Sequence, residues 1–359
     1  MRLRKIALIT LCIVTCFLSC NKDDDTEEIV VEVNDRTEQE VIDNGLLIDY
    51  LETHYYNSSE FESITNPTIA DLVITELIDG EVPDGHTLFK NGDVLEVDEK
   101  TIVYADTKYT YYVLNLNQGG DIKSPTFADN VVMLYEGFTL DNEVFDSAVN
   151  PVEIDLIGTS TALNPGVIVG WRRVLPDFNV AEDFAENGDG TVSFLNQGIG
   201  VMFLPSGLAY FSNSLTGIPA YSPLIFKFEL LQTTENDHDG DGIPSHIEDL
   251  SGDGEVTVNY DDLTDETDDD TDGDRLPNYL DSDDDGDGVL TINELERITY
   301  VVYTNQGEQE PVLNEKIEFE LERSDNAGVI TIKTLKIVDS DNNDIDDHLD
   351  KDVTTNYSE

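Results

Sequence analysis

The chain has 359 residues and a formal net charge of −58, with 39% hydrophobic and 27% charged residues. This length and hydrophobic content are compatible with two or three folded domains. The acidity is concentrated between Glu235 and Glu296, where Arg275 is the only basic residue. Because such a field repels nucleic acid and attracts cations, we expect no nucleic-acid partner.

The N-terminus has the pattern of an export signal. Basic residues near the start precede an apolar run over 6–18, which is short for a membrane span. The run ends in Phe17-Leu18-Ser19-Cys20, which resembles the bacterial lipobox; an ordinary secretory signal is the alternative. We predict a signal peptide over 1–19 and an outer-membrane lipoprotein held in the lipid bilayer through Cys20. Residues 21–25 resemble the export signal of Bacteroidota surface lipoproteins, so the protein is expected to face the periplasm or the cell surface.

The next part of the chain predicts a tether, a helix and a small region of mixed structure. Residues 20–36 are polar and acidic, as is typical of a tether. From Thr37 to Glu40 the spacing is that of a capping box, and apolar residues then recur at helical intervals, which predicts a helical stalk over 38–56. Within the 37–107 region, the part after this helix alternates short apolar runs with turn signals, which predicts a β-rich or irregular pre-domain of unassigned function.

Residues 108–234 read as strands around one short helix that begins near Trp171. Over 224–230 apolar and polar residues alternate, which predicts a half-buried strand. Between Trp171 and Tyr210 an acidic stretch is followed by a glycine-rich turn.

Seven pieces of this segment form an ordered set: 131–137, Phe145-Asp146-Ser147, Pro151, Val167-Ile168-Val169-Gly170-Trp171, Leu208-Ala209-Tyr210, Gly217-Ile218-Pro219 and 224–230. Together they resemble the FKBP-type peptidyl-prolyl cis-trans isomerases. The resemblance implies an α+β fold in which an antiparallel sheet wraps a short helix. It also implies an enzyme that acts on X–Pro segments of exported polypeptides.

By the same resemblance, nine residues would line the pocket: Tyr135, Phe145, Asp146, Val167, Ile168, Trp171, Tyr210, Ile218 and Phe226. Trp171 would be the floor that receives the prolyl ring. The backbone N–H of Ile168 and the hydroxyl of Tyr210 would donate to substrate carbonyls, and Asp146 would be the carboxylate that faces the cavity.

Isomerisation by such a pocket requires no cofactor, because the barrier arises from amide resonance and a dry aromatic site favours the twisted, less polar form. Since the pocket precedes the Asp-rich segment, we expect removal of metal to leave isomerisation nearly unchanged. By the same resemblance, the chain between Trp171 and Tyr210 carries an insertion that would cover or extend the pocket. Phe211 departs from the family pattern, in which a small residue follows Ala-Tyr, and two loops are shortened. These departures favour the alternative, a non-catalytic surface module that binds peptides or acts in adhesion, with a stiffened spacer behind it.

Residues 235–296 contain repeated acidic loops. The 237–248 and 283–294 stretches have the spacing of the 12-residue EF-hand loop, with oxygens at positions 1, 3, 5, 9 and 12, a Gly at position 6 and an aliphatic residue at position 7. The predicted calcium ligands are Asp237, Asp239, Asp241, Ile243 (through its carbonyl), Ser245 and Glu248 in the first loop, and Asp283, Asp285, Asp287, Val289 (carbonyl), Thr291 and Glu294 in the second.

Less regular copies of the loop surround these two. The 270–281 stretch offers Asp270, Asp272, Asp274 and Asp281, and a further copy lies within 339–350. The recurrence resembles thrombospondin type 3 or dockerin-like repeats more than paired helical EF-hands, because Pro244 and Pro277 at position 8 disfavour a preceding helical residue. We predict structural Ca²⁺; a solvated acidic linker is the alternative. Residues 297–359 are expected to form a β-rich extension.

Overall fold

The computed structural model describes residues 33–78, 80–159, 166–188, 190–265 and 267–358. The chain divides into two compact units, Met1–Asn34 and Asp35–Glu359, and the second contains every element described below. The predicted signal peptide, Cys20 and most of the tether lie outside the described residues. Within the described part of the chain, no helix has the length and apolar character to cross a membrane.

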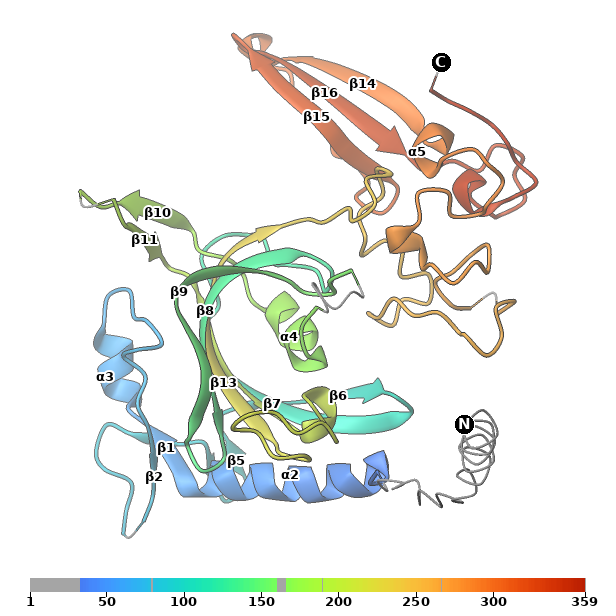
Figure 1. Ribbon diagram of the computed structural model, residues 1–359. Helices are drawn as coiled ribbons and strands as arrows, with labels where there is room; N and C mark the ends of the chain where they lie inside the picture. Colours follow the sequence, from blue (N-terminus) through green and yellow to red (C-terminus); the bar gives the residue numbers. More distant parts are fainter. Residues whose placement is uncertain (1–32, 79, 160–165, 189, 266, 359) are drawn as a thin grey trace, which may run out of the picture. The chain divides into compact units, whose positions relative to one another are not determined.

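The first helix is α2, Arg36–Thr53. It begins slightly earlier than predicted, because the side chain of Asp35 caps it by accepting from the N–H groups of Thr37 and Glu38. Leu47 and Leu51 are fully buried and share an apolar cluster with strands of the main sheet. The prediction of a stalk is therefore wrong: α2 is a packed part of the core that lies along the outer side of the sheet (Figure 1).

The pre-domain consists of short elements. A three-stranded antiparallel sheet has the order β2-β1-β3, from β1 (His54–Tyr56), β2 (Ile74–Glu76) and β3 (Thr87–Leu88). Helix α3 spans Ser58–Ser63, and β4 (Lys90–Asn91) pairs with β5 (Val94–Leu95). Phe61, Leu72 and Phe89 are buried in the same cluster as α2, so these elements cover one face of the main sheet.

The main sheet has six antiparallel strands in the order β6-β7-β12-β13-β8-β9. They span β6 Asp98–Tyr104, β7 Thr107–Asn117, β8 Asn130–Thr139, β9 Val144–Asp155, β12 Gly198–Leu204 and β13 Leu224–Thr234. The sheet curves around helix α4, Val169–Val174, as Figure 1 shows. The α+β class with an antiparallel sheet and a short helix is confirmed. The expected boundary at 107/108 falls within the β6–β7 hairpin, so β6 belongs to the same sheet.

Strand β13 is buried on both faces, which corrects the prediction of a half-buried strand. Phe226 and Phe228 pack into the cluster around α4, whereas Ile225 packs into the cluster of α2 and the pre-domain. Glu229 is only 3% exposed and accepts hydrogen bonds from the N–H of Ile69 (2.8 Å) and from Nε2 of Gln197 (3.0 Å). The pre-domain therefore supplies both the apolar cover and the polar partner that this face needs.

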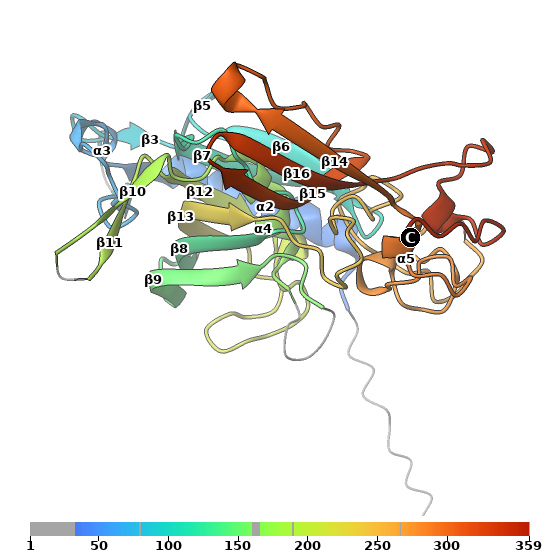
Figure 2. The same cartoon turned by 90° about the horizontal axis from the view of Figure 1, so that it is seen from above.

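The insertion after α4 forms a hairpin of β10 (Asp183–Glu186) and β11 (Val192–Leu195). Short 3₁₀ turns η1 (Leu175–Asp177) and η2 (Ser206–Leu208) flank it. Asn66 fastens the base of the hairpin, because its Nδ2 donates to the carbonyl of Phe194 (2.9 Å) and its Oδ1 accepts from the N–H of Asn196 (2.9 Å). The hairpin projects away from α4 in both views (Figures 1 and 2).

The Asp-rich segment contains little regular structure beyond η3 (Asn278–Leu280) and α5 (Thr291–Glu294). Strands β14 (Glu296–Tyr303), β15 (Glu318–Asn326) and β16 (Val329–Lys336) then form an antiparallel sheet in the order β14-β16-β15, within the region expected to be a β-rich extension. Two further turns are η4 (Thr304–Gln306) and η5 (Asp347–Leu349). Ile243 of the first acidic loop is buried with Leu295, Phe319, Leu335 and Ile337, so this sheet and the loop share one small core.

Candidate functional site

The side chain of Trp171 sits at the centre of a cluster of aromatic rings. Its ring centroid lies 5.0 Å from that of Phe226, 5.7 Å from that of Phe228 and 5.9 Å from that of Tyr135. Close approach of α4 to the sheet allows this, since a Cβ on Gly170 would lie 2.2 Å from Cδ1 of Leu204. The indole is 6% exposed.

A second close approach brings Phe145 into the cluster. Phe145 and Phe226 meet edge to face with centroids 5.5 Å apart. Gly137 pairs with Phe226 on one side and with Asp146 on the other. A Cβ on Gly137 would lie 2.6 Å from Phe226 and 2.7 Å from Phe145, so the absent side chain leaves the space that both rings fill.

One carboxylate stands at the rim of this cluster. Oδ2 of Asp146 accepts from the hydroxyl of Tyr135 (2.7 Å), and its Oδ1 accepts from the N–H of Ser147 (2.9 Å). Burial, followed by the hydrogen bond to Asp146, raises the pKa of Tyr135. Burial and then the charge of Asp146 also raise the pKa of Tyr210, so both phenols stay protonated and can donate at neutral pH.

The nine predicted pocket residues come together. Trp171, Ile218 and Phe226 are buried in the cluster around α4, and five others pack against it while partly exposed: Tyr135, Phe145, Val167, Ile168 and Tyr210. Asp146, the ninth, is exposed and joined to Tyr135. The set therefore has a buried apolar floor and a partly exposed rim that carries two phenols and one carboxylate.

Phe211 is accommodated outside this set. Its ring lies 4.2 Å from the guanidinium carbon of Arg36 and meets Tyr221 edge to face at 5.2 Å. The residue has a left-handed backbone conformation with φ +47°, which turns the chain immediately after Tyr210. Phe211, the residue that departs from the pattern of the resembled family, therefore contacts the start of α2.

Sequence reasoning missed the residue that holds the turn before Tyr210. Oδ2 of Asp43 accepts from both the backbone N–H (2.7 Å) and the hydroxyl (2.5 Å) of Ser206, and its Oδ1 accepts from Nε2 of Gln39 (2.7 Å). Asp43 is fully buried. The available signal was its position, because Gln39, Asp43 and Leu47 recur at four-residue intervals and share one face of α2.

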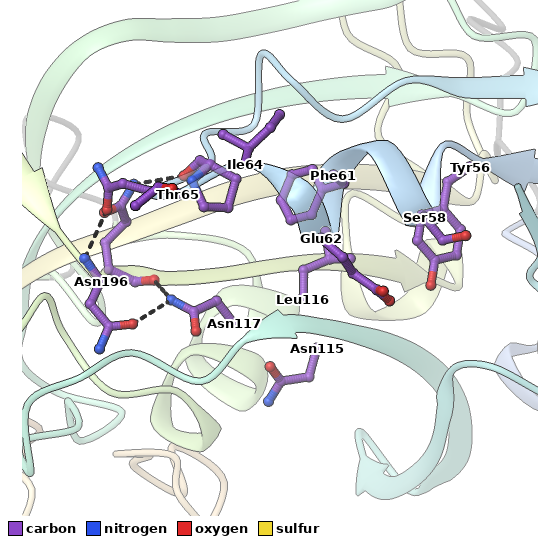
Figure 3. A pocket seen from close by; sticks show the side chains of 13 residues that line it. Tyr56, Ser58, Phe61, Glu62, Ile64, Thr65, Asn115, Leu116, Asn117 and Asn196 are labelled. Atoms are coloured by element: carbon purple, nitrogen blue, oxygen red, sulfur yellow. Dashed lines mark hydrogen bonds between the residues drawn. The ribbon is translucent and has the colours of Figure 1, made fainter. Parts of the chain in front are cut away.

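Trp171 does not line either of two hollows that lie near the sheet. One, of about 680 Å³, runs beside Ile218 and Pro219. The other, of about 410 Å³, lies between residues 56–67 and the ends of β7 and β11 (Figure 3). In the second hollow Nδ2 of Asn117 donates to Oδ1 of Asn196 (3.0 Å), and the N–H of Asn196 donates to Oδ1 of Asn66 (2.9 Å), so these amides join the pre-domain to the sheet.

The predicted ligands of the 237–248 loop divide into two groups. Asp239, Asp241 and Glu248 bring one oxygen each into a set whose atoms lie within 4.8 Å of one another. Asp237 instead accepts from the N–H groups of Gly240 (2.7 Å) and Gly242 (3.0 Å), and so shapes the loop. The hydroxyl of Ser245 accepts from the N–H of His238 (3.1 Å). The fourth member of the set is Asp284, which the loop spacing does not assign.

The 283–294 loop places Asp283, Asp285 and Asp287 in a second such group. Glu294 is fully buried, and its two oxygens have no hydrogen-bond partner among the described residues. Burial, and then the neighbouring carboxylates, raise the pKa of Glu294 to about 9. Val289 donates its N–H to Asp287 (2.6 Å), and the hydroxyl of Thr291 accepts from the N–H of Asp284 (3.2 Å).

The 270–281 loop forms a third group from Asp270, Asp272 and Asp274. Asp281, the expected twelfth residue, accepts from the N–H of Asp283 (3.1 Å) and thereby joins this loop to the next. These three groups have the donor chemistry of a hard cation site, because every contributing atom is a carboxylate oxygen.

Comparisons with known proteins bear on parts of the chain. A family model described as BamM C-terminal matches residues 238–315, and it is not a model of the thrombospondin type 3 or dockerin-like repeats that the spacing resembles. The comparison with curated proteins gave no match.

Three solved structures are similar to about a third of the chain. One is a peptidyl-prolyl cis-trans isomerase from Pseudomonas syringae pv. tomato, with 21% identity over 35% of this chain and 76% of that one, and a TM-score of 0.27. FkpA from Escherichia coli shows 25% identity over 34% of this chain and 48% of its own, at a TM-score of 0.27. The three FKBP domains of wheat FKBP73 show 17% identity over 35% and 47%, again at a TM-score of 0.27. The chain spans about half the length of the last two, and matches of this size carry no conclusion about activity.

Proposed function

We propose that the segment 108–234 catalyses cis-trans isomerisation of X–Pro bonds in exported polypeptides. The observation that carries the proposal is the convergence of four rings from β8, β9, α4 and β13 on one site, with the Asp146 carboxylate fixed at its rim by Tyr135. An apolar floor suits a prolyl ring, and a hydrogen-bonding rim suits the peptide carbonyls on either side of it.

Isomerisation of an X–Pro bond requires an apolar environment around the amide and no nucleophile or general base. Amide resonance makes the barrier to rotation about 18–20 kcal/mol, and the twisted amide has lost much of its charge separation. A site lined by Trp171 and Phe226 therefore favours the twisted amide over the planar, more polar one. Because its pKa is raised, the hydroxyl of Tyr210 stays protonated as a hydrogen-bond donor throughout the neutral range.

A second candidate function is non-catalytic peptide binding. Its support is the closure of the floor: Trp171 is 6% exposed, and Phe226 is 3% exposed. A peptide that stays on the rim of Tyr135, Phe145 and Tyr210 would be held without its prolyl bond reaching the indole. In this alternative, the protein is a surface module that binds peptides or acts in adhesion, and the calcium-bound acidic loops stiffen the spacer behind it.

A proline-limited assay on the full chain separates the two functions. We expect the wild type to accelerate the slow X–Pro phase, which otherwise lasts seconds to minutes. Tyr210→Phe should lose most of this acceleration, and Trp171→Ala all of it, while Tyr303→Phe on the distant strand β14 serves as the matched control. A wild-type chain that binds prolyl peptides without accelerating the phase would establish the binding module instead.

We also propose that the acidic loops bind structural Ca²⁺. The support is the grouping of carboxylates described above, with buried oxygens that lack partners among the described residues. Calorimetry should detect Ca²⁺ binding, with Mg²⁺ substituting poorly because it demands closer octahedral ligands. Glu294→Gln should weaken binding, whereas Glu296→Gln, outside the loop spacing, should not. If calorimetry detects no heat of Ca²⁺ binding, the segment is a solvated acidic linker and not a calcium-binding module.

For the N-terminus we propose lipid anchorage in the outer membrane through Cys20. The support is the lipobox-like sequence, and multiple acyl chains anchor a protein stably. Cys20→Ser should release the chain from the membrane fraction or trap its precursor. Protease applied to whole cells then tells the cell surface from the periplasm.

A further inference from the structure

The cation group at the 237–248 loop includes a residue from another loop. Asp239, Asp241 and Glu248 come from the loop itself, but Asp284 is the second residue of the 283–294 loop, a position to which the EF-hand spacing assigns no ligand. One oxygen from each of the four lies within 4.8 Å of the others. Calcium–oxygen distances of 2.3–2.6 Å allow two ligands on opposite sides of one ion to be about 5 Å apart, so the four oxygens fit one Ca²⁺.

Buried oxygens without partners give a second, independent indication. Glu248 is 3% exposed and Asp284 is 2% exposed, and neither carboxylate has a hydrogen-bond partner among the described residues. Oδ2 of Asp241, a residue that is 1% exposed, is in the same condition. Buried carboxylates without partners are costly, and coordination of a metal ion is one of the few arrangements that compensates them.

The local backbone explains how Asp284 reaches the first loop. Its neighbours Asp283 and Asp285 belong to the group of the second loop. Asp284 is held between them, because its N–H donates to the hydroxyl of Thr291 (3.2 Å) within its own loop. Three consecutive residues thus present carboxylates to two different groups.

We propose that Asp284 is a ligand of the cation bound by the 237–248 loop, and that the two loops therefore bind Ca²⁺ cooperatively. This rests on the proposed calcium binding of the acidic loops. A cation in the second loop orders residues 283–285 and thereby presents Asp284 to the first loop. The entropy cost of ordering residues 283–285 is then incurred only once for the two ions, so binding of one ion strengthens binding of the other.

The test is calcium titration calorimetry on the full chain and on four variants. Asp284→Asn and Glu248→Gln should each weaken the same site by at least about tenfold, the loss that even an outer-shell partner of a metal can cause. The double variant should lose little more than either single one. Asp261→Asn removes an exposed carboxylate of the same acidic segment outside the three groups and should behave as the wild type.

Thermal unfolding distinguishes a ligand from a structural role. Without Ca²⁺, Asp284→Asn should leave the melting temperature unchanged or raise it, since it relieves repulsion among buried carboxylates, while the rise on adding Ca²⁺ should shrink. Equal falls in both conditions, additive losses in the double variant, or wild-type calcium binding by Asp284→Asn would each overturn the proposal. A wild type that binds no Ca²⁺ overturns the calcium function itself, and this outcome differs from the loss of the Asp284 ligand alone.

Discussion

Gly137 sets the spacing of the aromatic rings at the candidate site. A Cβ there would be 2.6 Å from Phe226 and 2.7 Å from Phe145, so Gly137→Ala must displace at least one ring. We expect a loss of about 1–3 kcal/mol in the free energy of unfolding, as for other overpacked cores. Gly45→Ala is the matched control, because its Cβ meets nothing within 4 Å on helix α2 and should stabilise by about 0.5–1 kcal/mol. Denaturant unfolding measures both, and a Gly137→Ala chain as stable as the wild type would show that the rings have room to spare.

Glu40 gives α2 a pH dependence. Burial raises the pKa of Glu40 from 4.5 to about 7, and the charge of Asp43 adds to this, against a hydrogen bond from the N–H of Thr110. The folded chain therefore holds a proton that the unfolded chain has lost between these two pH values, so this group lowers stability as pH rises from about 4.5 to about 7.

Glu40→Gln should remove that dependence while keeping an acceptor for Thr110. Its stability relative to the wild type should grow across this window, with a slope of up to about 1.4 kcal/mol per pH unit, and level off above it. Unfolding curves at several pH values measure the slope. Parallel curves for the two proteins would mean that Glu40 titrates normally.

At the scale of elements, Asp43 connects α2 to the turn that precedes Tyr210. Asp43→Ala leaves the buried N–H and hydroxyl of Ser206 without their acceptor. We expect destabilisation of about 1–3 kcal/mol and weaker binding of prolyl peptides, because η2 leads directly into Tyr210. Asp49→Ala, an exposed carboxylate on the same helix, should change neither quantity. If Asp43→Ala lowers stability but leaves peptide binding unchanged, the contact between α2 and this turn does not influence the pocket.

Local patterns predicted the elements well, and partners distant in sequence account for what they missed. The short motif around Trp171 and the alternation over 224–230 were enough to place α4 and β13. Glu229 nevertheless looked like a solvent-facing residue, because its partner Ile69 lies 160 residues earlier. Asp284 was missed for the same reason, since its companions belong to another loop. A single sequence shows spacing within a loop, but it does not show which loops meet.

At the scale of the whole molecule, the acidic segment is bonded to the sheet that carries the candidate pocket. Glu255 pairs with Arg172 and Arg173, each at 2.8 Å, and these arginines directly follow Trp171 in α4. Tyr279 is buried with Ala128 and Ile157, which lie next to the ends of β8 and β9. The domain order in the sequence suggested two independent modules, whereas these contacts join the acidic segment to α4 and to residues beside the ends of β8 and β9.

These ion pairs lead to a prediction that differs from the expectation of an isomerisation unaffected by metal removal. The carboxylate of Asp269, next to the 270–281 loop, accepts from the N–H groups of Leu250 (2.8 Å) and Thr257 (2.7 Å) and so holds the stretch that contains Glu255. Stripping Ca²⁺ should loosen that stretch, release Arg172 and Arg173, and lower prolyl-peptide affinity by about fivefold or more, in the range of ordinary allosteric coupling.

Glu255→Gln should reproduce this loss in the presence of Ca²⁺ and make the chain insensitive to chelator, because the link is already cut. Glu308→Gln, remote from α4, is the matched control and should respond to chelator as the wild type does. Peptide titrations of the three proteins, with Ca²⁺ and with chelator, decide between coupling and independence. If Glu255→Gln binds peptide normally and still loses affinity on chelation, the coupling runs through the buried contact of Tyr279 instead of through the arginines. If chelator changes none of the three affinities, the pocket is independent of the metal, as the order of the domains first suggested.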